Sequence, residues 1–189
     1  MTYLETRLKG GDNVNRYATD DDFCEVFREK LDSLYQLSFL VTADHEKAER
    51  CLLASLEDCY RSNRVFREWV LAWAKYTIIR NAIRELLPRP HRDRSYPAET
   101  ALRRRGNLPP FLDDYFKTEA VLALEDIERV VFVTSVLERY FDRDCAALLG
   151  CSLTEIRQAR TQAILHIMVS GQPASRRSGE EGADLISSS

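Results

Sequence analysis

Apolar residues recur every three or four positions between residues 23 and 87, which is the spacing of helices that bury one face. The "TDDD" ahead of Phe23 supplies a cap and first-turn carboxylates for a first helix. Its apolar stripe comprises Phe23, Phe27, Leu31, Leu34 and Val41. Asp44 is predicted to cap a second helix, and a third is predicted to run from Phe66 to Leu86 and to stop at Pro88. No segment alternates with a period of two for long enough to predict a strand.

The same pattern divides the chain into two helical lobes separated by a linker. The segment 88–118 holds five of the six prolines and seven basic residues against four acidic ones, a composition typical of a linker. The predicted divisions are a flexible N-terminus (1–22), a helical domain (23–87), the linker (88–118), a second helical domain (119–169) and a disordered tail (170–189). We therefore expect an all-α fold of two small lobes joined by a Pro/Arg-rich linker.

The stretch "YFDRDCAALLGCSLTEIRQAR", residues 140–160, predicts two helices joined by a tight turn. Gly150 can end the first helix by adopting a positive φ. Ser152 and Glu155 have the spacing of a capping box, in which each side chain bonds the backbone N–H of the other. Ala146 is small where the two helices would cross. The buried stripe predicted for the second helix is Ile156, Ala159, Ala163 and Ile167.

This spacing turns four polar residues of the second helix outward: Thr154, Arg157, Gln158 and Thr161. Arginine can pair with guanine, glutamine with adenine and threonine with either base. Arg160 lies nearer the buried side, where a backbone phosphate is the better partner. The segment is predicted to be a DNA-reading helix-turn-helix, and an ordinary helical hairpin with solvated polar residues is the alternative.

The wider run "LALEDIERVVFVTSVLERYFDRDCAALLGCSLTEIRQARTQAI" resembles the C-terminal promoter-binding region 4 of bacterial RNA polymerase sigma factors. The closest class is the small two-lobed extracytoplasmic-function group. The resemblance falls, without a gap, on Arg129, Val131-Phe132, Asp144-Cys145-Ala146, Leu149-Gly150-Cys151-Ser152 and Ile156-Arg157. In the N-terminal lobe, "LYQLSFLVTADHEKAE" and "FREWVLAWAKYTI" resemble motifs of region 2. The resemblance covers about residues 30–167.

The resemblance implies that the N-terminal lobe binds core RNA polymerase and captures a melted strand of the minus-ten element. It implies that the C-terminal lobe docks its second helix in the minus-thirty-five element. The predicted single-strand contacts are Arg61, Arg64, Arg67, Lys75 and Arg80. Between Arg61 and Arg84 six basic residues face one acid, with aromatic residues interleaved, a combination that suits phosphates and stacked bases. The two tryptophans of that run are expected to pack in the core.

The polymerase-binding residues that the resemblance implies on the second helix are Glu49, Arg50, Leu53 and Glu57. This helix departs from the family pattern, because the usual acid is Arg50 and the usual Gln-acid pair is Leu53-Ala54. The connection "RSNRV" to the third helix is also shorter than is usual for the family. A diverged interaction module that binds a protein regulator, such as an anti-sigma factor, and does not itself open promoters is the alternative function.

The C-terminal lobe from Glu119 to Val169 carries five arginines and eight acids, for a net charge of −3. DNA-binding lobes are usually basic, because phosphate neutralisation supplies much of their affinity. Ala159 and Gln162 are neutral at positions where the family often has basic residues. We therefore expect the second helix to read DNA when polymerase brings it to the promoter.

The composition excludes several other classes. No apolar run approaches the ~20 residues of a membrane span, and the N-terminus shows no basic and apolar leader. Five cysteines without a C-x-x-C pair predict reduced thiols in a cytoplasm, packed among apolar residues. The three histidines share no ligand spacing with cysteines or carboxylates, so no metal site is predicted. No catalytic residue, cofactor or enzymatic activity is predicted either.

Overall fold

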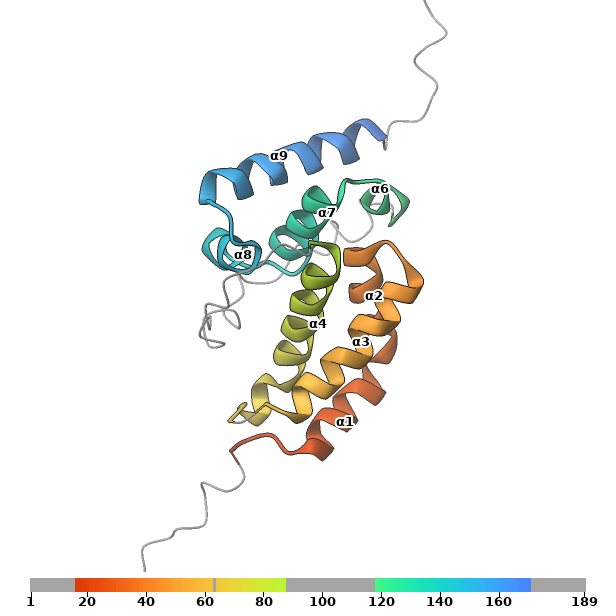
Figure 1. Ribbon diagram of the computed structural model, residues 1–189, viewed down its shortest axis with the longest axis vertical. Helices are drawn as coiled ribbons and strands as arrows, with labels where there is room; N and C mark the ends of the chain where they lie inside the picture. The colour runs from red at the N-terminus through yellow and green to blue at the C-terminus, as the bar shows by residue number, and fades with distance from the viewer. Residues whose placement is uncertain (1–15, 63, 88–117, 171–189) are drawn as a thin grey trace, which may run out of the picture.

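The computed structural model describes residues 16–62, 64–87 and 118–170 (Figure 1). The N-terminal lobe contains α1 (Asp20–Glu29), α2 (Leu31–Thr42), α3 (His45–Tyr60), the 3₁₀ turn η1 (Arg67–Trp69) and α4 (Val70–Leu86). The C-terminal lobe contains α6 (Thr118–Leu122), α7 (Asp126–Phe132), the π-helical turn η3 (Val133–Leu137), α8 (Asp142–Leu149) and α9 (Leu153–Ser170). The predicted all-α class is confirmed. The predicted linker, the predicted tail beyond Ser170 and most of the predicted flexible N-terminus lie outside the described residues.

The predicted caps are in place at the starts of two N-terminal helices. Thr19 forms a capping box with Asp22, so α1 begins at Asp20, three residues before the predicted start. The Asp44 carboxylate accepts from the backbone N–H of Lys47 at 2.9 Å and caps α3. These bonds satisfy N–H groups that the first turn of a helix leaves without partners.

The single helix predicted from Phe23 through Val41 is wrong, because the chain breaks at Lys30 into α1 and α2. Lys30 has φ −112° and ψ 17°, outside the helical region. The break changes which residues face inward: Leu34 is fully buried, whereas Leu31 is 50% exposed. The apolar stripe therefore consists of two shorter stripes that pack separately.

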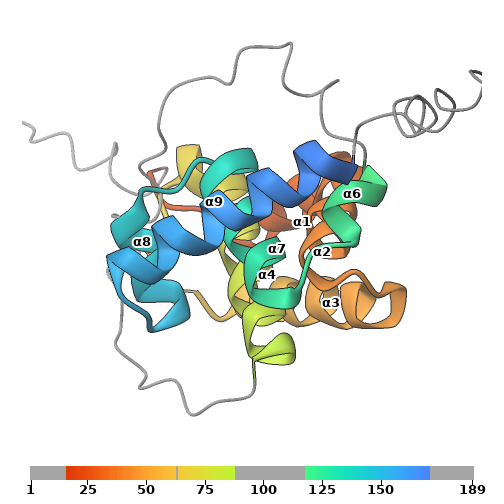
Figure 2. The same cartoon turned by 90° about the horizontal axis from the view of Figure 1, so that it is seen from above.

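The N-terminal lobe packs α1, α2 and α3 around α4, whose buried residues include Ile78, Ile79 and Ile83. The predicted third helix begins with the short turn η1, and its α-helical part starts at Val70. In the C-terminal lobe α9 packs across α7 and α8, as Figure 2 shows from above. Among the described residues, the β-type pairing is an isolated bridge between Tyr17 and Phe66.

The two lobes pack against each other, with α6 and α7 on α2 and with α8 on α4. Figure 1 shows α7 between α9 and the end of the N-terminal lobe. The buried residues of both lobes form one hydrophobic cluster, which joins Val41 and Ile79 to Val130 and Phe132. The arrangement places α9 at one end of the molecule and the start of α1 at the other.

Candidate functional site

The turn between α8 and α9 has the predicted local structure. Gly150 adopts φ 63°, which a glycine tolerates without steric cost, and it ends α8. The Ser152 backbone N–H donates to Glu155 Oε2 at 2.7 Å, and the Glu155 backbone N–H donates to Ser152 Oγ at 3.2 Å. The bond from the Ser152 backbone N–H to the carboxylate lowers the pKa of Glu155 from its ordinary value. The predicted capping box is thus confirmed.

The inward and outward faces of α9 also follow the predicted spacing. Ile156, Ala163 and Ile167 are buried, and Ala159 packs against the core while partly exposed. The predicted reading residues Thr154, Arg157, Gln158 and Thr161 are all exposed. Four polar side chains of the types that contact base edges therefore share an open face of one helix.

Asp142, in the first turn of α8, holds both arginines of α9. Its carboxylate accepts from Arg157 Nε at 3.2 Å and from Arg160 Nη1 at 2.6 Å. Arg160 is only 23% exposed, in agreement with its predicted place near the buried side, whereas Arg157 is 64% exposed. The shared carboxylate offsets part of the positive charge that this face would present to phosphate.

The five predicted single-strand residues fall into two groups. Arg61, Arg64 and Arg67 are exposed around the connection between α3 and α4. Arg61 forms an ion pair with Glu57 at 3.4 Å, and Arg67 forms one with Asp22 at 2.7 Å. These three cations lie on the surface where a ligand can reach them.

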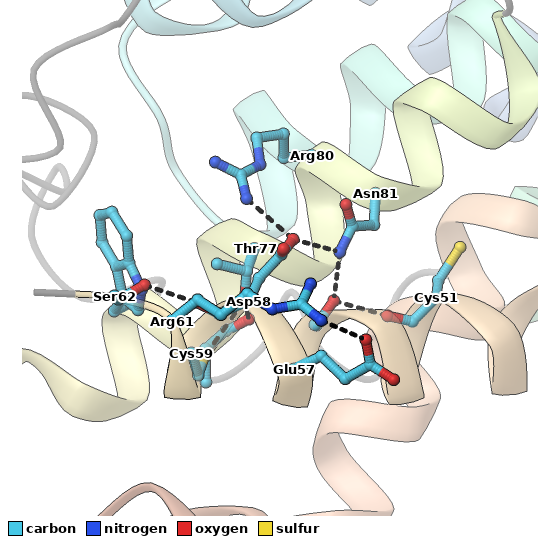
Figure 3. Close-up of polar contacts among 12 residues, drawn as sticks. Cys51, Glu57, Asp58, Cys59, Arg61, Ser62, Thr77, Arg80 and Asn81 are labelled. Carbon is cyan, nitrogen blue, oxygen red and sulfur yellow. Dashed lines mark hydrogen bonds and ion pairs between the residues drawn. The ribbon is translucent and has the colours of Figure 1, made fainter. Parts of the chain in front are cut away.

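Lys75 and Arg80 are placed differently, because both are partly buried in ion pairs. Lys75 Nζ lies 2.7 Å from Glu138 Oε1, across the contact between the lobes. Arg80 donates to Asp58 Oδ2 at 2.9 Å, and Asn81 donates to the same oxygen at 3.0 Å (Figure 3). Lys75 thereby joins α4 to the residue that follows η3, and Arg80 joins α4 to α3.

An aromatic cluster that the sequence did not reveal lies beside the exposed arginines. The Tyr17 ring stacks on Phe66 with the centroids 5.1 Å apart, and Phe66 meets Trp69 edge to face at 4.9 Å. The guanidinium of Arg16 lies over the Phe66 ring at 5.2 Å. Helical periodicity carried no signal for Tyr17, because it precedes the first helix and is placed by the bridge to Phe66.

The predicted polymerase-binding residues lie on the exposed side of α3. Glu49, Arg50, Leu53 and Glu57 are all exposed, and Leu53 is 65% exposed. Arg50 is engaged with two carboxylates, at 2.6 Å to Glu46 and 2.5 Å to Glu85. Arg50 is therefore held by ion pairs within the lobe.

Leu53 belongs to a shallow groove between α1 and α3. The groove is lined largely by apolar side chains: Phe27, Leu31, Leu52, Leu53 and Leu56, together with Cys24, Arg28 and Tyr60 at its edge. The Cys24 thiol and the Tyr60 hydroxyl are hydrogen-bonded at 2.7 Å, which raises the pKa of Tyr60. An exposed apolar groove of this kind is typical of a protein-binding surface.

The other sequence predictions concern cysteines, metals and membranes. Cys51, Cys59 and Cys145 are buried as predicted, but Cys24 is exposed, so the prediction that all five pack in the core is wrong. Across the described ranges no cluster of three His, Cys, Asp or Glu side chains is arranged to hold a metal ion. Within those same ranges, no helix has both the length and the apolar composition that crossing a bilayer requires.

No protein-family model matches the chain. No curated protein matches it either. Among solved structures, it is similar to a chain in the co-crystal structure of the sigma factor RpoE in complex with the anti-sigma factor NepR from Bartonella quintana. The identity is 18%, the TM-score is 0.44, and the match covers 79% of this chain and 96% of that chain.

Proposed function

We propose that the chain is a sigma-factor-like protein that binds core RNA polymerase and directs promoter recognition in transcription initiation. The observation that carries the proposal is the exposed face of α9 directly after the Gly150 turn. Thr154, Arg157 and Gln158 project there from the first two turns of the helix. A helix-turn-helix inserts the N-terminal part of its second helix into the major groove. The gapless fit of this segment to the sigma pattern supports the same function.

The N-terminal lobe supports the second half of the proposal, which is capture of a melted promoter strand. Arg61, Arg64 and Arg67 are exposed next to the aromatic cluster of Tyr17 and Phe66. Single-stranded nucleic acid is bound by cations that meet phosphates and by rings on which bases stack. Polymerase would contact the exposed side of α3, where Glu49, Arg50, Leu53 and Glu57 lie.

In vitro transcription with the cognate core enzyme on a promoter library tests this function. We expect promoter-specific transcripts, and we expect Arg157→Ala together with Gln158→Ala to abolish promoter selection. The matched control is Met168→Ala, which truncates an exposed residue near the other end of α9. Transcription that survives the double substitution with its promoter choice unchanged would remove these residues from DNA reading.

A second candidate is a sigma-like module that binds a regulatory protein and does not open promoters. The groove around Leu53 favours it, since 65% of this leucine is exposed among other apolar residues. Leu53→Asp should abolish binding of a protein partner, whereas Ala54→Asp, an exposed neighbour outside the groove, should not. Co-purification from cell extract separates the two candidates. If the wild-type protein retains core polymerase and the Leu53→Asp variant does not, the sigma function is favoured. Retention of another regulator without polymerase favours the module.

A further inference from the structure

The segment before α1 is fixed to the connection between α3 and α4. The backbone N–H of Ala18 donates to the Val65 carbonyl at 2.7 Å, and that of Arg67 donates to the Arg16 carbonyl at 3.1 Å. These bonds flank the isolated bridge between Tyr17 and Phe66. Two stretches of extended backbone are thereby clipped together, so Tyr17 is held in place by main-chain bonds although it lies outside the helices.

The main-chain bonds around Tyr17 and Phe66 bring three aromatic rings together, and this stack of rings is open on one side. Tyr17 and Phe66 are nearly parallel, with an interplanar angle of 17°, and Trp69 supports Phe66 at 89°. Phe66 and Trp69 are partly buried, but 42% of Tyr17 is exposed. One face of the Tyr17 ring is covered by Phe66, and the remaining exposed surface is available to a further planar group.

Exposed arginines lie on the two segments that carry these rings, and the Arg16 guanidinium lies over the Phe66 ring at 5.2 Å. Arg16 and Arg64 are exposed, and neither forms an ion pair with any residue in the described ranges. Arg64 adopts φ 67° in the turn directly before Val65, whose carbonyl accepts from Ala18. Nearby acids offset part of this charge: Asp22 is paired with Arg67, and Asp20 and Asp21 on α1 and Glu68 on η1 are exposed.

We propose that Tyr17, stacked on Phe66 and flanked by Arg16 and Arg64, binds an unpaired base of a single-stranded nucleic acid. The base would stack on the open side of Tyr17, and the arginines would meet the adjacent phosphates. Aromatic platforms flanked by cations bind single strands with little sequence preference, because every base has a π-face. The inference rests on the proposed promoter-strand capture, and it adds Tyr17 and Arg16 to the residues that carry out that step.

Fluorescence anisotropy of the full chain with labelled 12-nucleotide probes tests the platform. The probes are a single-stranded deoxyoligonucleotide, the same sequence as RNA, and its DNA duplex. Tyr17→Ala should weaken single-strand binding by about tenfold, whereas Tyr17→Phe should stay within about twofold of the wild type. The matched control is Tyr35→Ala, since Tyr35 is also a partly exposed tyrosine that stacks on another ring, Phe39.

Arg16→Ser and Arg64→Ser should each reduce the dependence of binding on salt by roughly 0.7 of a logarithmic unit per lost phosphate contact. Preferential binding of either single-stranded probe over the duplex supports the platform, and the tighter of the two identifies the ligand as DNA or RNA. Equal binding of duplex and single strand, or equal losses for Tyr17→Ala and Tyr35→Ala, would overturn it. A thermal melt of each variant shows that the fold is retained.

The two proposals fail in different experiments. Single-strand binding by the free protein without association with core polymerase contradicts the proposed function and leaves the platform standing. Promoter-specific transcription that Tyr17→Ala leaves unchanged, together with no single-strand binding by the wild type, contradicts the platform and leaves the proposed function standing.

Discussion

The guanidinium of Arg129 crosses between the two lobes and donates from Nε to the carbonyl oxygen of Val41 at 3.0 Å. Val41 belongs to the last turn of α2, whose carbonyls lack partners within the helix. Arg129 also donates from Nη1 to the Leu124 carbonyl at 2.6 Å, pairs with Asp126, and is only 4% exposed. One buried cation of the C-terminal lobe therefore completes the end of a helix in the N-terminal lobe.

Replacing Arg129 with methionine should destabilise the chain by about 3 kcal/mol. The substitution keeps much of the apolar volume but leaves the Val41 and Leu124 carbonyls buried without their donor. Urea denaturation should show a lower midpoint with an unchanged slope. Arg143→Met is the matched control, because Arg143 is exposed in the same lobe. Equal shifts for the two variants would contradict a structural role for Arg129.

The ion pair between Lys75 and Glu138 should contribute to holding the lobes together. Their side chains are 21% and 11% exposed, so water screens the attraction less than it does at the surface. A double-mutant cycle with Lys75→Met and Glu138→Gln should give a coupling free energy of about 1 kcal/mol. The exposed pair Arg61–Glu57 serves as the control and should give about 0–0.5 kcal/mol. A coupling no larger than that of the control pair would mean that this contact does not join the lobes in solution.

Asp142 is expected to restrain DNA binding by α9, if α9 reads DNA as proposed. Asp142→Asn should release Arg157 and Arg160, so that the polymerase-bound protein binds promoter duplex several-fold more tightly. The dependence of affinity on salt should become steeper, by roughly 0.9 of a logarithmic unit for each new phosphate contact. Glu125→Gln makes the same change in net charge at an exposed acid of this lobe and should have less effect. Identical effects of the two substitutions would show that net charge alone matters.

Acid should destabilise the chain through its helix caps. Backbone N–H groups lower the pKa of Asp22, Asp44 and Glu155 from ordinary values of 3.8, 3.8 and 4.5. A carboxyl with a lowered pKa binds a proton less readily in the folded state than in the unfolded state. The stability that it contributes is therefore complete above its ordinary pKa, and it is lost as the pH falls through the lower folded value.

Asp44→Asn tests this dependence, because asparagine can still cap α3 but does not ionise. The loss of stability between about pH 7 and about pH 3, measured by urea denaturation, should be smaller in this variant than in the wild type. Asp32→Asn changes an exposed acid in the first turn of α2, where no side chain caps the helix, and serves as the control. An unchanged pH dependence in Asp44→Asn would contradict the assignment.

Thiol reactivity should distinguish the exposed cysteine from the buried ones. Burial raises the pKa of Cys51, Cys59 and Cys145 to about 11, which leaves little reactive thiolate at neutral pH. Cys24 is exposed and should be alkylated first in the native protein, with the three buried thiols reacting after urea is added. Peptide mapping by mass spectrometry after timed alkylation measures this order. Rapid labelling of Cys145 in the native state would mean that the C-terminal lobe opens readily.

The sequence by itself determined the caps of α1, α3 and α9 and which faces of α3 and α9 are buried. Thr19, Asp44 and Ser152 cap helices through bonds to residues only three positions away. Interactions of this range depend on local backbone geometry alone, so residue types and spacing are sufficient to predict them. The buried stripe of α9 followed in the same way from helical periodicity.

Only the tertiary structure decided how the candidate residues are used. Arg129 reaches Val41 across 88 positions and Lys75 reaches Glu138 across 63, and no local pattern encodes such partners. The break at Lys30 was likewise not predicted, because no glycine or proline marks it in the sequence. Tyr17 meets Phe66 because main-chain bonds join two segments that are distant in the sequence. Helical periodicity reports which side of a helix is apolar, but the partner of each side chain is set by the packing of remote segments.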